Sequence, residues 1–199
     1  PMTLLGKKTL PAGNLTELIA HLRANRDKIT MANAGLGAVS HLCGMLFQKA
    51  IGLDLVTVPY KGTAPAMTDL LGGQVDVLCD QTTQTLQHIA AGNVKLYGVT
   101  ASKRIAALPN APTLAESGLK DFQVVVWHGM YLPKATPKPV ADRLTAALQA
   151  SLKEPDVRKK LQDLHIAARS SSPEQTRQLL ESEIKRWGEV ITRANIPRQ

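Results

Sequence analysis

Short apolar runs alternate with amphipathic helical patterns over most of this chain, and this alternation limits the choice of fold more than any other feature. Gly, Pro and Asn residues separate the runs, which are rich in Val, Leu and Ile, from the helical segments. The pattern predicts an α/β fold with a parallel-type sheet and helices on both faces. We expect strands at residues 29–33, 53–60, 75–79, 95–100 and 122–131.

The helical segments carry their own start and stop signals. Asn14 has the side chain of an N-cap, Pro65 suits a first helical turn, and Gly72-Gly73 and Gly92 are typical of helix ends. Apolar residues at helical spacing predict helices at 15–25, 38–51, 65–71, 82–91, 113–117, 137–152, 156–164 and 172–194. The last three follow Pro133 and have no strands to pack on beyond residues 166–168.

The charge of the chain is compatible with several kinds of partner. A formal net charge of +8 suits nucleic acid, a membrane surface or an anionic ligand. The Lys and Arg residues are scattered, however, and the densest cluster, at 158–160, lies on an expected helix as a solvated face. Aromatic residues make up only 4%, too few for a base-stacking surface. With no DNA- or RNA-binding motif present, the sequence disfavours nucleic acid.

The two cysteines, Cys43 and Cys79, lie far apart in apolar stretches. Their spacing matches neither a zinc site nor a redox motif. They are interpreted as two buried thiols that behave as small apolar groups, and a disulfide between them stays open.

Ligands of parallel α/β sheets bind where strands end and the next helix begins. The junction at residues 33–41 combines Gly35 and Gly37 with a helix start, and backbone N–H groups there can hold an anion. Ser40 and His41 can add donors. The alternative is a simple tight turn in which His41 is a surface or core histidine.

Two further junctions offer polar groups. Lys61 supplies a charge, Gly62 supplies room and Thr63 a hydroxyl, although a solvated turn with Thr63 as a helix cap explains the same residues. Asp80 and Thr82 follow the next strand. Either residue can cap a helix, or Asp80 can accept hydrogen bonds from loop amides and ligand hydroxyls.

Catalytic patterns are not found. The sequence contains no GxSxG nucleophile motif, and its five histidines show no metal-binding spacing. No pair of carboxylates is singled out as an acid/base couple. Binding is therefore favoured over catalysis, with no metal and no cofactor expected.

Several stretches resemble a known family, the extracytoplasmic receptors of tripartite tricarboxylate transporters, also called Bug receptors. The resemblance runs from about residue 10 to residue 196. The matching stretches are residues 33–47, Val58-Pro59-Tyr60-Lys61-Gly62, Asp69-Leu70-Leu71-Gly72-Gly73-Gln74-Val75-Asp76, residues 108–118 and Arg186-Trp187. The second and third of these blocks, in this order and spacing, are the most specific.

The resemblance implies a periplasmic-binding-protein-like fold (type II, Venus flytrap) in which two α/β lobes close around a small organic acid. It implies a receptor in the periplasm that delivers its ligand to membrane permease subunits and is not an enzyme. Residues 10–124 would form the second lobe. The ligand-binding residues implied are Asn33, Ala34, Gly35, Gly37, Ala38, Ser40, His41, Lys61, Gly62, Asp80 and Thr82.

The chain departs from the family at its start, where we expect the N-terminal part of the first lobe to be absent. Residues 125–199 would then supply a return strand and C-terminal helices of that lobe. Two expectations follow: ligand binding by this chain alone is weak, and its exposed first-lobe helices form a homodimer. The alternative function is a cytoplasmic ligand-sensing regulatory domain, for which no DNA-binding segment is found.

Overall fold

A computed structural model describes residues 1–193, without the side chains of Val190 and Arg193. In chain order, its strands and helices are β1 (Met2–Lys7), α1 (Leu15–Ala24), β2 (Thr30–Asn33), α2 (Val39–Ile51), β3 (Val56–Pro59), α3 (Thr63–Leu71), β4 (Val77–Gln81), α4 (Thr82–Ala90), β5 (Val94–Val99), α5 (Lys138–Ser151), α6 (Pro155–Asp163) and α7 (Pro173–Arg193). The predicted long helices are confirmed to within two residues, and the expected end at residue 194 lies outside the described residues.

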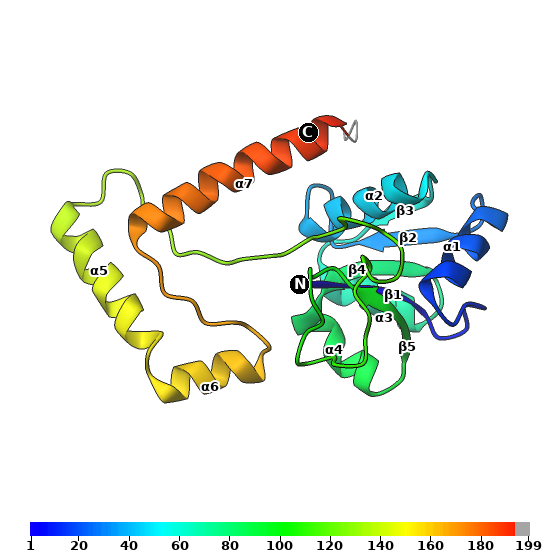
Figure 1. Cartoon of the computed structure of the whole chain (residues 1–199), viewed down its shortest axis with the longest axis horizontal. Helices are drawn as coiled ribbons and strands as arrows, with labels where there is room; N and C mark the ends of the chain where they lie inside the picture. Colours follow the sequence, from blue (N-terminus) through cyan, green and yellow to red (C-terminus); the bar gives the residue numbers. More distant parts are fainter. Residues whose placement is uncertain (194–199) are drawn as a thin grey trace. The chain divides into compact units, whose positions relative to one another are not determined.

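The strands form one mixed sheet in the order β3-β2-β4-β1-β5 (Figure 1). β2 pairs in parallel with β3 and β4, whereas β1 is antiparallel to β4 and β5. The α/β class is therefore confirmed, but the sheet is not purely parallel. β2, β3, β4 and β5 all end at one edge of the sheet, which we call the ligand edge, and β1 begins there.

Strand β1 was not predicted, although it is central to the sheet. Its residues Met2, Leu4 and Leu5 are all fully buried. A strand buried on both faces lacks the apolar/polar alternation by which a half-buried strand is recognised. β1 lies before residue 10, where the resemblance was expected to begin, so the sheet starts earlier in the chain than we predicted.

Helices cover both faces of the sheet (Figure 1). α2 packs on one face, where Gly44 lets the helix come so close that an added Cβ would lie 3.0 Å from the Met31 side chain. α3 and α4 pack on the other face, over a core of Leu5, Ala32, Ala66, Met67, Leu70, Val75, Leu78 and Val94. α2, α3 and α4 follow β2, β3 and β4, so all three helices begin at the ligand edge.

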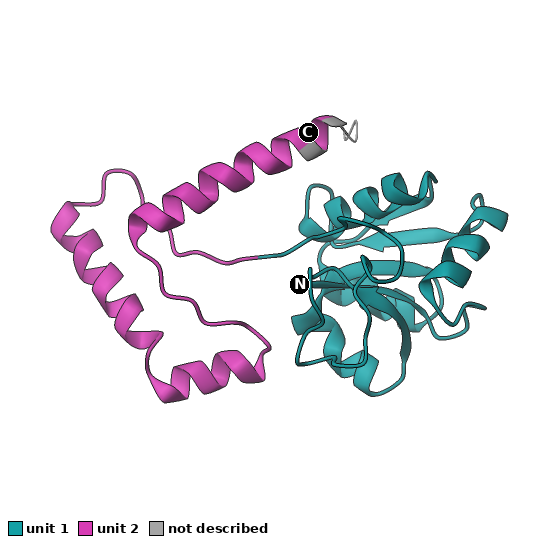
Figure 2. Cartoon of the chain, in the orientation of Figure 1, with its two compact units in different colours: residues 1–126, 198–199 teal, residues 127–197 magenta. Residues whose placement is uncertain are grey.

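The chain divides into two compact units (Figure 2). Unit 1 contains residues 1–126 and the whole sheet, and unit 2 begins at Trp127 and contains α5, α6 and α7. Every buried residue that the structure describes lies in unit 1. No helix in the described part of the chain is long and apolar enough to cross a membrane.

Two predicted elements are wrong. Residues 122–131 do not form a strand: Val124 pairs with Thr100 through hydrogen bonds of 3.0 and 2.5 Å, but the residues after it have no strand beside them. Residues 113–117 form turns instead of a helix, held by Thr113, whose backbone bridges to Val99. In both places the sequence contains the expected apolar residues, but the described residues do not form the continuous backbone hydrogen bonds that would make a strand or a helix.

Candidate functional site

The first two predicted junctions lie side by side at the ligand edge. The Tyr60 N–H donates to the Asn33 carbonyl at 3.0 Å, and the Gly62 N–H donates to the Ala34 carbonyl at 3.1 Å. These bonds extend the pairing of β2 with β3 beyond the ends of both strands. The turn before α2 and the turn before α3 therefore form one connected surface.

Asp80 joins this surface from the end of β4, and is 2% exposed. Burial raises the pKa of the Asp80 carboxyl above its ordinary value, while the Gln81 N–H and the nearby Thr63 hydroxyl act in the opposite direction. The Gln81 N–H donates to Oδ1 at 2.7 Å, whereas Oδ2 has no partner of good geometry among the described residues. Because Thr63 is the first residue of α3, the Asp80 carboxyl lies next to the start of that helix.

The turn before α2 satisfies most of its own amides. The Ala34 N–H donates to the Ser40 Oγ at 2.7 Å, and the Gly35 N–H donates to the Asn33 Oδ1 at 2.9 Å. The Gly37 N–H donates to the His41 Nδ1 at 3.2 Å. These amides, expected from the sequence to hold a ligand, instead give the turn its shape.

Glycine is needed in this turn for its backbone conformation. Gly35 has φ of +127° and Gly37 has φ of +75°, values that L side chains rarely adopt. A Cβ at Gly35 would also lie 3.2 Å from the Tyr60 carbonyl oxygen, whereas one at Gly37 would meet nothing within 4 Å.

The donors that remain are the leading amides of α2. The first intrahelical bond runs from the Leu42 N–H to the Ala38 carbonyl at 3.0 Å, so the N–H groups of Val39, Ser40 and His41 have no partner inside the helix. Ala38, at the N-cap, has no side chain that could accept from them, and the first turn holds no acidic residue. Three uncompensated donors and the positive end of the helix dipole thus coincide.

Helix α1 shows what a compensated start looks like in the same chain. The Asn14 Oδ1 accepts the Glu17 N–H at 2.9 Å, and Glu17 reaches back to accept the Gly13 N–H at 2.6 Å. Because β1 is antiparallel, α1 starts at the opposite edge of the sheet. Among the four helices of unit 1, α1 starts away from the ligand edge and is capped, whereas α2, α3 and α4 start at that edge and have no side-chain cap.

The starts of α3 and α4 differ in what they offer. Gly62, the N-cap of α3, has φ of +112°, and the adjacent Lys61 side chain is exposed. At α4, the N–H and hydroxyl of Thr82 both point to the Pro1 carbonyl, at 3.3 and 3.4 Å. Thr82 is therefore engaged within the fold, while Lys61 and Gly62 stay accessible.

Two more polar groups at the α2 turn bear on binding. The Asn33 Nδ2, in a residue only 2% exposed, has no partner in the described chain. Burial lowers the pKa of His41, which favours its neutral form. Since the Nδ1 accepts the Gly37 N–H, the proton of the neutral ring lies on Nε2, where it can be donated.

The two cysteines form a disulfide, so the interpretation as two thiols is wrong. Cys43 lies on α2 and Cys79 on β4, with a sequence separation of 36 and Cα atoms 6.1 Å apart. Both residues are fully buried. Sequence spacing could not show this pairing, because it depends on α2 packing across β4.

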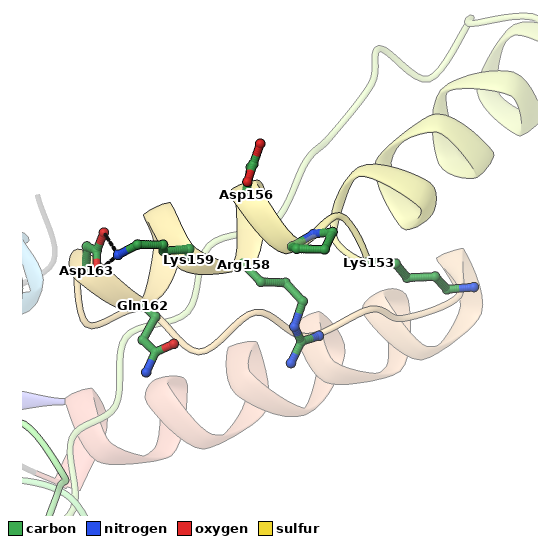
Figure 3. Close-up of a pocket in the computed structure, with 7 residues that line it drawn as sticks. Lys153, Asp156, Arg158, Lys159, Gln162 and Asp163 are labelled. Carbon is green, nitrogen blue, oxygen red and sulfur yellow. Dashed lines mark hydrogen bonds and ion pairs between the residues drawn. The ribbon is translucent and has the colours of Figure 1, made fainter.

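A depression in unit 2 does not have the features of a competing site. An open depression of ≈ 640 Å³ lies on α6 and the turn before it (Figure 3). Its charged side chains are exposed, and Lys159 is paired with Asp163 at 3.0 Å, as expected of a solvated face. Among the described residues, no group of three or more His, Cys, Asp or Glu side chains could hold a metal ion.

Two features of the site were not predicted from the sequence: the individual role of Val39 within the 33–41 junction, and the contact of the Thr63 hydroxyl with Asp80. Val39 supplies one of the three uncompensated α2 amides, and Thr63 lies against Asp80. The rule that the first amides of a helix lack intrahelical partners could have pointed to Val39. The contact between Thr63 and Asp80 joins the first residue of α3 to the end of β4 and has no local signal in the sequence.

Comparison with known proteins gives a family match over nearly the whole chain. The model of the tripartite tricarboxylate transporter family receptor matches residues 1–196. The UPF0065 protein in the TAR-I ttuE-ttuC' intergenic region of Agrobacterium vitis is 43% identical over 197 residues, which are 98% of this chain and 57% of that protein. The chain thus spans little more than half the length of that relative.

Solved structures agree with this match. The periplasmic binding protein BugD is 46% identical with a TM-score of 0.93, over 100% of this chain and 67% of that one. MatC of Rhodopseudomonas palustris with bound malate is 37% identical with a TM-score of 0.86, over 96% of this chain and 66% of that one. Over about two thirds of their length, these neighbours share the fold of this chain, which is therefore a partial flytrap fold of the periplasmic-binding-protein type.

Proposed function

The chain belongs to the tripartite tricarboxylate transporter receptor family, and we propose that it captures a small organic carboxylate outside the cytoplasm for uptake by a transporter of that type. The malate bound to MatC supports the ligand class. The structural observation that carries the proposal is the start of α2, where the amides of Val39, Ser40 and His41 have no cap and no partner in the described part of the chain.

A carboxylate satisfies what this helix start lacks. Its two oxygens can accept from the three amides, and its charge is stabilised by the helix dipole. Among the residues predicted from the sequence, Ser40 and His41 would contact the ligand, and Asn33, Ala34, Gly35, Gly37 and Ala38 would hold the turn in shape. Lys61, Gly62 and Asp80 would line the neighbouring surface, and Thr82 would contribute least, because its donors are engaged.

An NMR titration of the ¹⁵N-labelled chain tests this proposal. Malate and succinate should shift the amide resonances of Val39, Ser40 and His41 in a saturable way, and an uncharged diol of similar length should not. If no carboxylate moves these resonances more than those at the start of α1, the proposed function is wrong.

We propose weak affinity for the chain by itself. The ligand edge of unit 1 offers donors from one side, and the chain covers about two thirds of its solved relatives, for example 67% of BugD. A ligand held from one side keeps much of its surface in water. Calorimetry with a carboxylate panel should give dissociation constants well above about 1 μM, a value that corresponds to −8.2 kcal/mol.

The disulfide supports a location outside the cytoplasm. Buried structural disulfides persist in oxidising compartments such as the periplasm and are rare where thiols are kept reduced. The family is extracytoplasmic, which also favours a receptor over the alternative of a cytoplasmic regulatory domain. Docking to membrane permease subunits is part of the proposal, and loss of carboxylate uptake after deletion of the gene would test it.

We also propose that unit 2 mediates a homodimer. Its helices expose large apolar side chains, among them Val140, Leu144, Leu179 and Ile184. Burying such a face against a second copy removes it from water. Light scattering of the purified chain should show a dimer, and a monodisperse monomer at high concentration would contradict this part of the proposal.

A further inference from the structure

The start of α2 needs something other than a cap to hold its direction. The turn before it bonds to the first turn of the helix, through Ala34 to Ser40 and Gly37 to His41, and these bonds do not fix the helix to the sheet. The three leading amides have no partner among the described residues. Their position must therefore be set by what anchors the first turns of the helix to the sheet.

The anchor lies on the buried face of α2. Cys43, Phe47 and Ile51 follow each other at helical spacing, and each is at most 4% exposed. Cys43 is the member nearest the amides and the one covalently attached to the sheet, through Cys79. The next residue, Gly44, has no side chain, so α2 lies directly against Met31 of β2 at this point.

The disulfide also joins the two parts of the candidate site. Cys43 follows His41 by two positions, and Cys79 directly precedes Asp80. The bond thus connects the α2 amides with the β4 end that lies beneath the start of α3. No other covalent link joins these elements except the main chain, over 36 residues.

We propose that the Cys43–Cys79 disulfide positions the α2 amides and thereby sets the carboxylate affinity of the site, beyond its contribution to stability. This inference rests on the proposed function. Reduction by a dithiol such as dithiothreitol cleaves the S–S bond, which takes up two electrons and two protons to give two thiols, while the dithiol becomes a cyclic disulfide. The reduced receptor is folded but binds carboxylates poorly.

The test compares ligand affinity with stability in the full chain. The Cys43→Ala/Cys79→Ala variant is titrated with malate by NMR, at a temperature where circular dichroism shows more than about 95% folded protein. Its affinity should fall about tenfold or more, because amides displaced by a fraction of an ångström no longer converge on one carboxylate. The Val39, Ser40 and His41 resonances should change even without ligand.

A matched control separates positioning from general destabilisation. Leu18→Ala opens the core beneath α1, whose start lies at the opposite edge, and should lower the unfolding midpoint while leaving malate affinity within about twofold. Wild-type chain refolded in dithiothreitol should match the double variant. If the double variant does not fold, Cys43→Ala/Cys79→Val refills the volume on β4 and takes its place.

Each outcome decides between the two proposals. Malate affinity in the folded, disulfide-free chain within about twofold of wild type would overturn this inference and leave the proposed function standing. An equal loss of affinity in Leu18→Ala would overturn it as well, since the effect would then follow stability. If the oxidised wild type shows no response to any carboxylate, the proposed function itself fails.

Discussion

At the scale of single residues, the ligand edge depends on backbone conformations that only some residues adopt. Gly37 and Gly73 have similar backbone conformations but lie in different places. Both have positive φ, +75° and +77°, and at both an added Cβ meets nothing within 4 Å. They differ in place: Gly37 lies before α2 at the ligand edge, whereas Gly73 follows α3 at the other end of that helix.

Replacing each glycine by valine should therefore separate conformation from binding. Both Gly37→Val and Gly73→Val should lower the free energy of unfolding by about 1–2 kcal/mol, the cost of a left-handed conformation for an L-residue. Only Gly37→Val should abolish the malate-induced shifts of the α2 amides. Urea denaturation and NMR titration measure the two effects, and retained binding in Gly37→Val would show that the turn is not part of the site.

Asp76, at the opposite edge, governs the behaviour of the fold in acid. Burial alone would raise the pKa of its carboxyl, but hydrogen bonds from Lys7 and Thr30, together with the Lys7 charge, outweigh burial and hold the pKa below its ordinary value of 3.8. A carboxyl with a depressed pKa stabilises the fold above its unfolded pKa and loses that contribution as the pH falls through the folded value.

We predict that Asp76→Asn costs about 1–3 kcal/mol at neutral pH, because charged hydrogen bonds to a buried carboxyl are lost. The difference from wild type should shrink as the pH falls below 3.8. Asp27→Asn is the control, since its side chain is 88% exposed in a surface ion pair. Urea unfolding at several pH values checks this; a constant difference across the acid range would contradict the assignment.

At the scale of elements, the chain treats its helix starts in two ways. At the start of α1, the side chains of Asn14 and Glu17 accept hydrogen bonds from backbone amides. At the start of α2, Ala38 is the N-cap and its side chain cannot accept any. A helix with an uncapped start loses stability that a single polar side chain could restore. A carboxylate ligand that accepts hydrogen bonds from the α2 amides would supply the stabilisation that the missing cap does not.

Two opposite substitutions test this account. Ala38→Asp places a carboxylate at a residue whose φ of −65° and ψ of 157° suit an N-cap. It should raise the free energy of unfolding by about 0.5–2 kcal/mol and weaken malate binding, because the protein's own carboxylate occupies the amides. Asn14→Ala should lower stability by a similar amount and leave binding unchanged.

Thermal unfolding and NMR titration of these two variants give the comparison. A stabilised Ala38→Asp chain that binds malate as tightly as wild type would show that the α2 amides do not hold the ligand. Loss of binding in Asn14→Ala would show that the site responds to stability in general.

At the scale of the whole molecule, the two units differ in what supports them. Unit 1 has a five-stranded sheet, a disulfide and a core on both faces of the sheet. In unit 2, no described residue is buried, and helices without a common core gain little from packing. We therefore expect unit 1 to fold when it is produced by itself, and unit 2 not to form a stable fold by itself.

We predict that a fragment of residues 1–126 unfolds cooperatively, with a midpoint within about 5 °C of the full chain, a shift equivalent to about 1 kcal/mol. A fragment of residues 127–199, diluted until it is monomeric, should show low helicity and no cooperative transition. Circular dichroism during heating measures both. An unfolded 1–126 fragment would show that unit 1 needs unit 2 for its stability.

The sequence by itself determined the features that depend on neighbours a few residues away. Helical periodicity located the long helices, the Asn14 cap was visible, and the Gly-containing turn at residues 33–41 pointed to the ligand edge. The family resemblance added the partial flytrap fold, which the similarity to solved binding proteins confirms. Each of these rests on a local backbone preference or on a contiguous motif.

Only the tertiary structure decided the rest. It inserted β1 between β4 and β5, paired Cys43 with Cys79, and showed that the Gly35 and Gly37 amides are occupied while those of Val39, Ser40 and His41 are free. β1 and Cys43 have partners that are distant in the sequence, and which amides stay free depends on side chains folding back onto the turn. Such pairings are set by how elements pack, which no local window of sequence contains.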